Sequence, residues 1–198
     1  MQKYSRVIIF ISILFCSACR GKEQKNIPGK ISSEEPISFF PVTDFLLGQL
    51  SEIDNLPVTP LKININGEKQ DSTWMKREDI RKLAAPFLYP VIDSVFMAKY
   101  FAGKSFLDQT INAFTFSYDV KEQLPDSIKL IHWDVYIDPQ KNTVQRIYMV
   151  KEDSNQAAHI TTQLTWNANK WFSVRTIIQS PGKEPEVKEE ILKWDFDD

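Results

Sequence analysis

The sequence predicts an α+β fold, in which an antiparallel β-meander of about six strands in the C-terminal half, together with an N-terminal hairpin, packs against two or three helices. Three observations predict it. Apolar residues recur with a helical period in residues 41–54 and 76–100, and with a period of two after residue 112. The helical segments precede the run of strands and do not alternate with them. Short turns separate the strands, and short connections join only antiparallel neighbours.

Two segments have the pattern of amphipathic helices. Residues 41–54 carry apolar side chains at i, i+3, i+4 and i+8, and Pro57 follows their end. Residues 76–100 repeat this spacing, but Pro86 and Pro90 interrupt it, so a bent pair of helices is predicted. The apolar stripes of these helices are expected to cover one face of the sheet.

Strands are predicted where apolar and polar residues alternate. Residues 61–66 alternate and lead into Asn66-Gly67, which is the strongest short signal for a hairpin. The six further runs are 114–120, 131–137, 144–150, 160–166, 171–178 and 187–196. Residues 101–110 show no clear period, and Gly103 indicates a turn there. The charged residues of the last run are typical of an edge strand that is protected from pairing with another chain.

Residues 1–18 have the features of an export signal. Lys3 and Arg6 supply the positive charge that precedes an apolar run at residues 7–15. This run is about half of the roughly 20 residues that a membrane-spanning helix needs, so a permanent span is not expected. The stretch is therefore interpreted as a signal peptide that is removed from the mature protein.

Residues 16–19, at the end of the export signal, indicate which type of signal peptide it is. Ser17 and Ala18 are small and directly precede Cys19. The segment resembles the lipobox of bacterial lipoproteins, in which small residues precede an obligatory Cys, although Cys16 stands where Leu is usual. The resemblance implies that Cys19 is diacylated, usually also N-acylated, and anchors the protein to a membrane. The alternative is an ordinary secretory peptide that is cleaved after Ala18 and leaves Cys19 as a thiol.

The chain is expected to have three regions: the signal peptide at 1–18, the lipidated Cys with a flexible tether at 19–38, and a single α+β globular domain at 39–198. The tether is polar and lacks the apolar spacing of a packed segment. Residues 1–18 hold two cations and no acid, so their removal changes the net charge from −2 to −4. The body is therefore not expected to adhere to an anionic bilayer through its net charge. The residues just after Cys19 are mixed and net basic, which favours the outer membrane, facing the periplasm.

Composition excludes several classes of function. Without a concentrated basic block, the sequence gives no sign of nucleic-acid binding. Two His and two Cys cannot form a Cys/His zinc cluster, and no motif for a metal or a cofactor is present. His132 and Asp134 point to the same face of one predicted strand, where they form either an oriented base or a polar cross-strand pair. We expect the polar pair and no enzymatic activity.

Aromatic side chains are the remaining functional candidates. Four Trp lie on the predicted strands, where they either fill the core or form a surface for a ligand or partner: Trp133, Trp166, Trp171 and Trp194. The chain resembles small envelope lipoproteins, so it is predicted to be a membrane-anchored, non-catalytic binding or accessory module for an envelope protein. The alternative is a periplasmic carrier of a lipid or another hydrophobic ligand between sheet and helices. The cavity of such a carrier would be lined by Phe114, Phe116, Trp133 and Tyr148.

Overall fold

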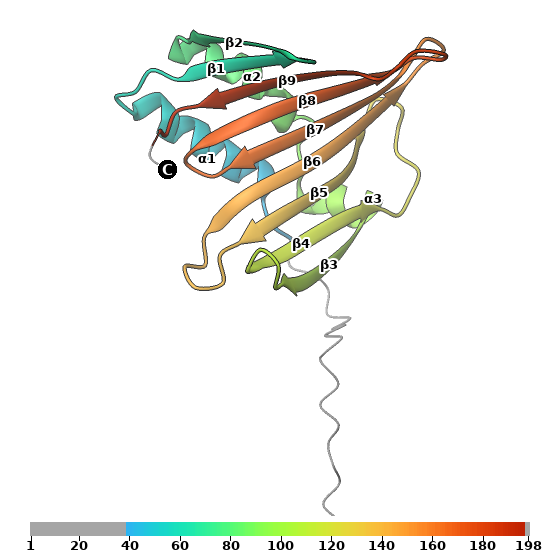
Figure 1. The fold of residues 1–198 in the computed structure, drawn as a ribbon. Coiled ribbons are helices and arrows are strands. Elements are labelled where there is room, and N and C mark those ends of the chain that lie inside the picture. Colours follow the sequence, from blue (N-terminus) through green and yellow to red (C-terminus); the bar gives the residue numbers. More distant parts are fainter. Residues whose placement is uncertain (1–38, 197–198) are drawn as a thin grey trace, which may run out of the picture. The chain divides into compact units, whose positions relative to one another are not determined.

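One antiparallel sheet of nine strands organises the protein, and three helices pack with it (Figure 1). The computed structural model describes residues 39–196, so the signal peptide, Cys19 and the tether lie outside the described residues. The strands lie in the order β2-β1-β9-β8-β7-β6-β5-β4-β3. The helices are α1 (Val42–Asn55), α2 (Arg77–Leu88) and α3 (Ser94–Tyr100). The strands are β1 (Leu61–Asn66), β2 (Lys69–Trp74), β3 (Phe101–Asp108), β4 (Ala113–Val120), β5 (Leu130–Ile137), β6 (Val144–Ser154), β7 (His159–Asn167), β8 (Trp171–Gln179) and β9 (Glu186–Lys193).

The helices form close to where the apolar spacing predicts them. Their buried apolar side chains are Val42, Leu46, Leu50 and Ile53 of α1 and Ile80, Ala84 and Phe87 of α2. Pro86 lies in the last turn of α2, which continues to Leu88 before the chain bends. α3 begins at Ser94, where the Asp93 carboxylate caps it by accepting a hydrogen bond from the Phe96 N–H at 2.7 Å. Within residues 39–196, no helix is long and apolar enough to cross a bilayer.

The sheet has more strands than the sequence predicts. β1 and β2 form the expected hairpin, in which Gly67 has a φ of 58°, and they belong to the same sheet as the meander. The additional strand is β3, so the turn predicted at Gly103 is wrong. β3 pairs with β4 along its whole length, from Phe101 opposite Val120 to Asp108 opposite Ala113. Because β3 is an exposed edge strand, backbone pairing defines it and an alternating pattern does not.

The last strand does not lie at an edge, which corrects the prediction. β9 lies between β8 and β1, because the N-terminal hairpin pairs with it from Leu61 opposite Lys193 onward. Its charged side chains find partners on neighbouring positions, as in the ion pair between Lys62 Nζ and Glu190 Oε1 at 2.5 Å. The charged side chains of β9, which are typical of an edge strand, therefore form ion pairs with a neighbouring strand. The edge strands of the sheet are β2 and β3.

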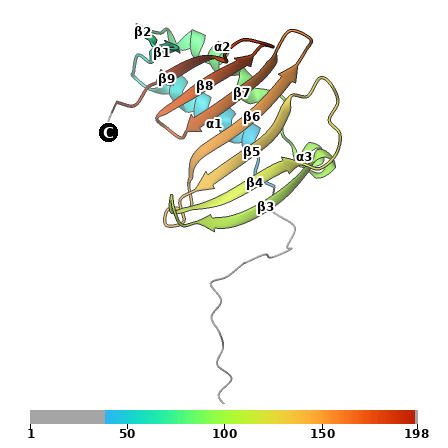
Figure 2. The ribbon, with the colours of Figure 1, turned by 45° about the vertical axis from the view of Figure 1, so that its right-hand side comes forward.

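The helices lie over one face of the sheet (Figures 1 and 2). Aromatic rings fill much of the core between them. Phe87 of α2 lies with its ring centroid 5.3 Å from that of Trp166 and 5.4 Å from that of Phe172. Farther along the sheet, Tyr118 stacks on Trp133 with a centroid distance of 4.6 Å. The core is thus a continuous aromatic layer that holds the helices on the sheet.

Only some of the residues named for a carrier cavity come together: the rings of Phe114 and Phe116 are in contact, with their centroids 5.3 Å apart. Trp133 opposes Met149 across β5 and β6, and both side chains are buried in the core. Tyr148 directly precedes Met149 in β6, so it points to the other face of the sheet. Phe114 is exposed near the start of β4. These side chains therefore cannot line one cavity.

The two ends of the sheet carry different connections, since neighbouring strands run antiparallel. At one end, which we call the cleft end, lie the β3–β4, β5–β6 and β7–β8 turns together with the end of β9 and the start of β1. Asn112, Asn142 and Asn169 take positive φ values in these three turns, a conformation that Asn tolerates better than most residues. The largest concave site described below lies at this end.

Candidate functional site

A cleft of about 560 Å³ opens between the C-terminal part of α1 and the cleft end of the sheet. We call it the α1 cleft. Its walls come from α1, the segment that leads to β1, the β7–β8 turn and the residues after β9. The lining residues are Gln49, Glu52, Ile53, Asn55, Leu56, Val58, Asn169, Trp194 and Asp195. A volume of this size is within the range of pockets that hold small molecules.

The α1 cleft combines apolar walls with a buried hydrogen-bond donor. Ile53 and Trp194 are almost fully buried, and Leu56 and Val58 add further apolar surface. The Trp194 indole N–H is buried and has no hydrogen-bond partner among the described residues. The indole N–H groups of Trp133 and Trp166 in the core are in the same state, so this donor does not distinguish the cleft. The apolar walls suit a molecule with an apolar body.

Hydrogen bonds of Gln49 fix the position of α1 relative to the β7–β8 turn at the α1 cleft. Its Nε2 donates to Glu52 Oε2 and to Asn169 Oδ1, each at 2.8 Å, and its Oε1 accepts from the Asn169 backbone N–H at 2.8 Å. These bonds join α1 to the β7–β8 turn, 120 residues away in the chain. The side chain is buried and fully bonded, so the cleft exists before a ligand arrives.

The four Trp candidates have different environments. Trp133 and Trp166 expose no more than 1% of their surface and belong to the core, so they offer no surface to a ligand or partner. Trp171 is half-buried on β8 and does not line the α1 cleft. Trp194, which follows β9, is the candidate that the structure brings to a concave site. Sequence reasoning missed Gln49, because no local pattern connects it to Asn169.

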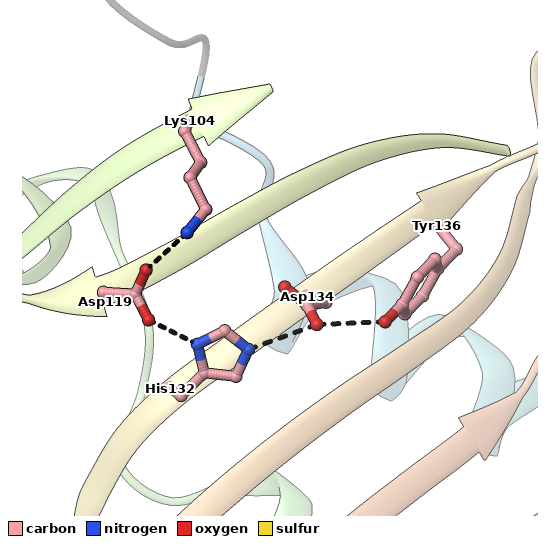
Figure 3. Close-up of polar contacts among 5 residues, drawn as sticks. All are labelled: Lys104, Asp119, His132, Asp134 and Tyr136. Carbon is pink, nitrogen blue, oxygen red and sulfur yellow. Dashed lines mark hydrogen bonds and ion pairs between the residues drawn. The ribbon is translucent and has the colours of Figure 1, made fainter. Parts of the chain in front are cut away.

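A polar network lies on the sheet face opposite to the aromatic core (Figure 3). His132 is held between two carboxylates, with Nδ1 2.7 Å from Asp119 Oδ1 and Nε2 3.1 Å from Asp134 Oδ2. Lys104 Nζ lies 3.0 Å from Asp119 Oδ2, and the Tyr136 hydroxyl donates to Asp134 Oδ2 at 3.0 Å. We call these five residues the His132 network. His132 and Asp134 share a face, as their spacing predicts.

The charges of the His132 network stabilise one another. The hydrogen bond to Asp134, supported by Asp119, raises the pKa of His132 above its usual value. Burial opposes ionisation of Asp134, but the hydrogen bonds from His132 and Ser117 hold the pKa of this carboxyl below its usual value. Burial and the neighbouring Asp134 raise the pKa of Tyr136 to about 12. The surroundings of His132 thus favour its protonated form and the ionised forms of the two carboxyls.

This geometry favours the polar pair over the oriented base. A general base needs a ring nitrogen that can accept a proton from a substrate. Both nitrogens of His132 lie within hydrogen-bonding distance of carboxylate oxygens, so neither is left to face a substrate. The His132 network thus fixes β4 to β5, and the α1 cleft is the better candidate for ligand binding.

Comparison with known proteins gives no relative from which a role could be transferred: no family model, curated protein or solved structure matches the chain significantly. Within residues 39–196, no group of three or more His, Cys, Asp or Glu side chains is placed to hold a metal ion. Function is therefore inferred from the residues and geometry of this chain alone.

Proposed function

We propose that this protein is a cell-envelope lipoprotein, anchored through acylated Cys19 to the outer membrane and facing the periplasm. Its body is a non-catalytic module that binds a molecule with an apolar part in the α1 cleft. The observation that carries the binding role is the preformed cleft of about 560 Å³ beside Trp194. The anchor is supported by the resemblance of residues 16–19 to a lipobox.

The lining of the α1 cleft indicates the character of the ligand. Apolar contact comes from Ile53, Leu56, Val58 and Trp194, whereas Glu52 and Asp195 supply carboxylates and no cation lines the cleft. Such a lining disfavours an anionic ligand, because like charges repel. We therefore expect a neutral or cationic molecule with an apolar part.

Replacing Leu56 with Asp is expected to weaken binding of a neutral apolar molecule at least roughly tenfold, because a carboxylate in an apolar wall must be desolvated when the ligand binds. Binding is measured by the fluorescence of N-phenyl-1-naphthylamine, a neutral apolar dye. Leu47→Asp is the matched control, because Leu47 is also an exposed Leu of this region but does not line the α1 cleft. Equal dye affinity of both variants and the original protein would contradict ligand binding in the cleft.

Replacing Cys19 with Ala is expected to abolish acylation and to release the protein from the membrane fraction. Two or more acyl chains hold a protein stably on a bilayer, since each buried CH₂ contributes about 0.8 kcal/mol. Incorporation of a radioactive fatty acid measures acylation, and fractionation of the cells measures attachment. Cys16→Leu is the control and should retain both, since Leu is the usual residue there. Unchanged labelling of Cys19→Ala would refute the anchor.

A further inference from the structure

Large apolar side chains are exposed together on the β3–β4 hairpin, at the cleft end. Phe106, Leu107, Ile111 and Phe114 each expose between 37% and 51% of their surface. Leu107 and Phe114 oppose each other in the register, whereas Phe106 points to the other face of the hairpin. Ile111 lies in the turn between the two strands. The tip is therefore apolar on both faces, and a cluster of this kind marks a docking surface.

A pocket with basic walls lies beside this hairpin. Ile111 borders a pocket of about 520 Å³ whose lining also includes Lys141, Arg146 and Lys170. We call it the basic pocket. The Arg146 guanidinium lies over the Tyr136 ring, 4.2 Å from its centroid, so its planar group is held in place. Lys and Arg side chains are the usual partners of phosphate groups.

Two acids lie near the basic pocket, where they close turns and also partly offset the charges of Lys141 and Arg146. Asp138, the one acid of its lining, accepts hydrogen bonds from the Gln140 and Lys141 backbone N–H groups at 2.8 and 3.0 Å. Asp108 on the neighbouring hairpin accepts bonds from the backbone and the hydroxyl of Thr110 at 2.9 and 2.6 Å. The lining of the pocket thus holds three cations and one acid. Cations therefore outnumber acids in the lining of the pocket, although the chain as a whole is net negative.

The tether is long enough for this end of the sheet to reach a bilayer. The chain joins the body at residues 39–40, where the Phe40 backbone hydrogen-bonds the side chain of Tyr118 in β4. The 19 residues from 20 to 38 reach at most about 60 Å when fully extended. A tether of this length keeps the body at a local concentration of about millimolar near the surface, so even a weak docking face is occupied.

We infer that the β3–β4 hairpin and the basic pocket dock the body onto the anionic lipid surface to which the protein is anchored. Apolar side chains enter the boundary between headgroups and acyl chains, and the cations contact lipid phosphates. The inference rests on the proposed acylation of Cys19. It also gives the α1 cleft a position close to the membrane, because Asn169 lines both the cleft and the basic pocket. A ligand of the cleft would then be an apolar molecule taken up at the bilayer surface.

A fluorescent probe at residue 111 tests this arrangement in the acylated protein. Once Cys16 is removed and Cys19 is acylated, Ile111→Cys supplies the single reactive thiol of the mature chain, and it is labelled with the dye NBD. Gln156→Cys is the control, because Gln156 is exposed in the β6–β7 turn at the opposite end of the sheet. Both proteins are placed in vesicles of phosphatidylcholine with phosphatidylglycerol. The probe at 111 is expected to shift to the blue and to be quenched by nitroxide-labelled lipid, while the probe at 156 stays in water.

The charge requirement is tested with the same probe. Lys141→Gln should reduce the population of docked protein roughly fivefold in vesicles with phosphatidylglycerol, because each cation near an anionic surface contributes to binding. It should have little effect in phosphatidylcholine alone. Vesicle-attached protein with an aqueous probe at 111, or an equal response at 111 and 156, would overturn the inference. Failure of the proposed anchor would be seen separately, as a Cys19 that takes up no fatty acid.

Discussion

Replacing Trp166 with Ala is expected to lower the free energy of unfolding by about 3 to 5 kcal/mol, because it deletes a large ring from a filled core. Trp166 is fully buried and contacts three rings, with centroid distances of 4.9 Å to Phe172, 5.3 Å to Phe87 and 5.8 Å to Trp194. The ring joins α2, β7, β8 and the wall of the α1 cleft. Urea unfolding followed by far-ultraviolet circular dichroism measures the change.

Trp74→Ala is the matched control for this substitution. Trp74 also lies on a strand but exposes 62% of its surface and packs on one ring, that of Phe196. Its replacement should change stability by less than about 1 kcal/mol, because little buried area is lost. Similar losses in the two variants would show that Trp166 is not the centre of the core that we describe.

Replacing Asp134 with Ala is expected to lower stability by about 2 to 3 kcal/mol at pH 5 to 6, because it leaves charged and polar groups without their partner. The Asp134 side chain is only 14% exposed and bonds both His132 and Tyr136. Asp119→Ala removes the other carboxylate of His132, whose side chain is 52% exposed, and should cost less than about 1 kcal/mol. Chemical unfolding of the two variants at the same pH gives the comparison.

The loss of stability caused by Asp134→Ala should become smaller both at low pH and at high pH. The pKa of Asp134 is lowered from 3.8, so its contribution is present above pH 3.8 and disappears as the pH falls through the folded-state value. The pKa of His132 is raised from 6.5, so its contribution is present below pH 6.5 and is lost as the pH rises through the folded-state value. The difference between the two proteins is therefore greatest between pH 3.8 and 6.5. A difference that stays constant from pH 3 to 9 would contradict an ionised pair.

Local pattern predicts most of the elements of this fold, but it does not predict which strands become neighbours. The meander follows from alternation and short turns, and α1 follows from its apolar spacing. β3 was missed because an edge strand is defined by pairing on one side, and its Gly103, Lys104 and Ser105 break the alternation. The charges of β9 indicate an edge strand when the sequence is considered alone. Their partners lie on β1, which is distant in the chain and which no local pattern connects to β9.

The candidate site was predictable only in part for the same reason. Trp194 could be found from composition, since an aromatic residue on a strand is a candidate for either core or surface. Its place in a cleft depends on the Gln49–Asn169 contact, which joins elements 120 residues apart. The pairing of His132 with Asp134 was predictable because a strand repeats every two residues. The second carboxylate, Asp119, comes from the adjacent strand opposite His132, and only the register reveals it.

The pairing of β1 with β9 has a consequence for how the protein reaches its folded state. β1 can pair with β9 only after β9 is present, since Leu61 of β1 pairs with Lys193 of β9. Such distant pairing requires closing a long loop, so folding is expected to take about milliseconds to seconds. Until β9 has been synthesised, β1 lacks this partner, and its unpaired backbone is open to association with other chains. Completion of the C-terminal strand β9 is thus the step that joins the β1–β2 hairpin to the rest of the sheet.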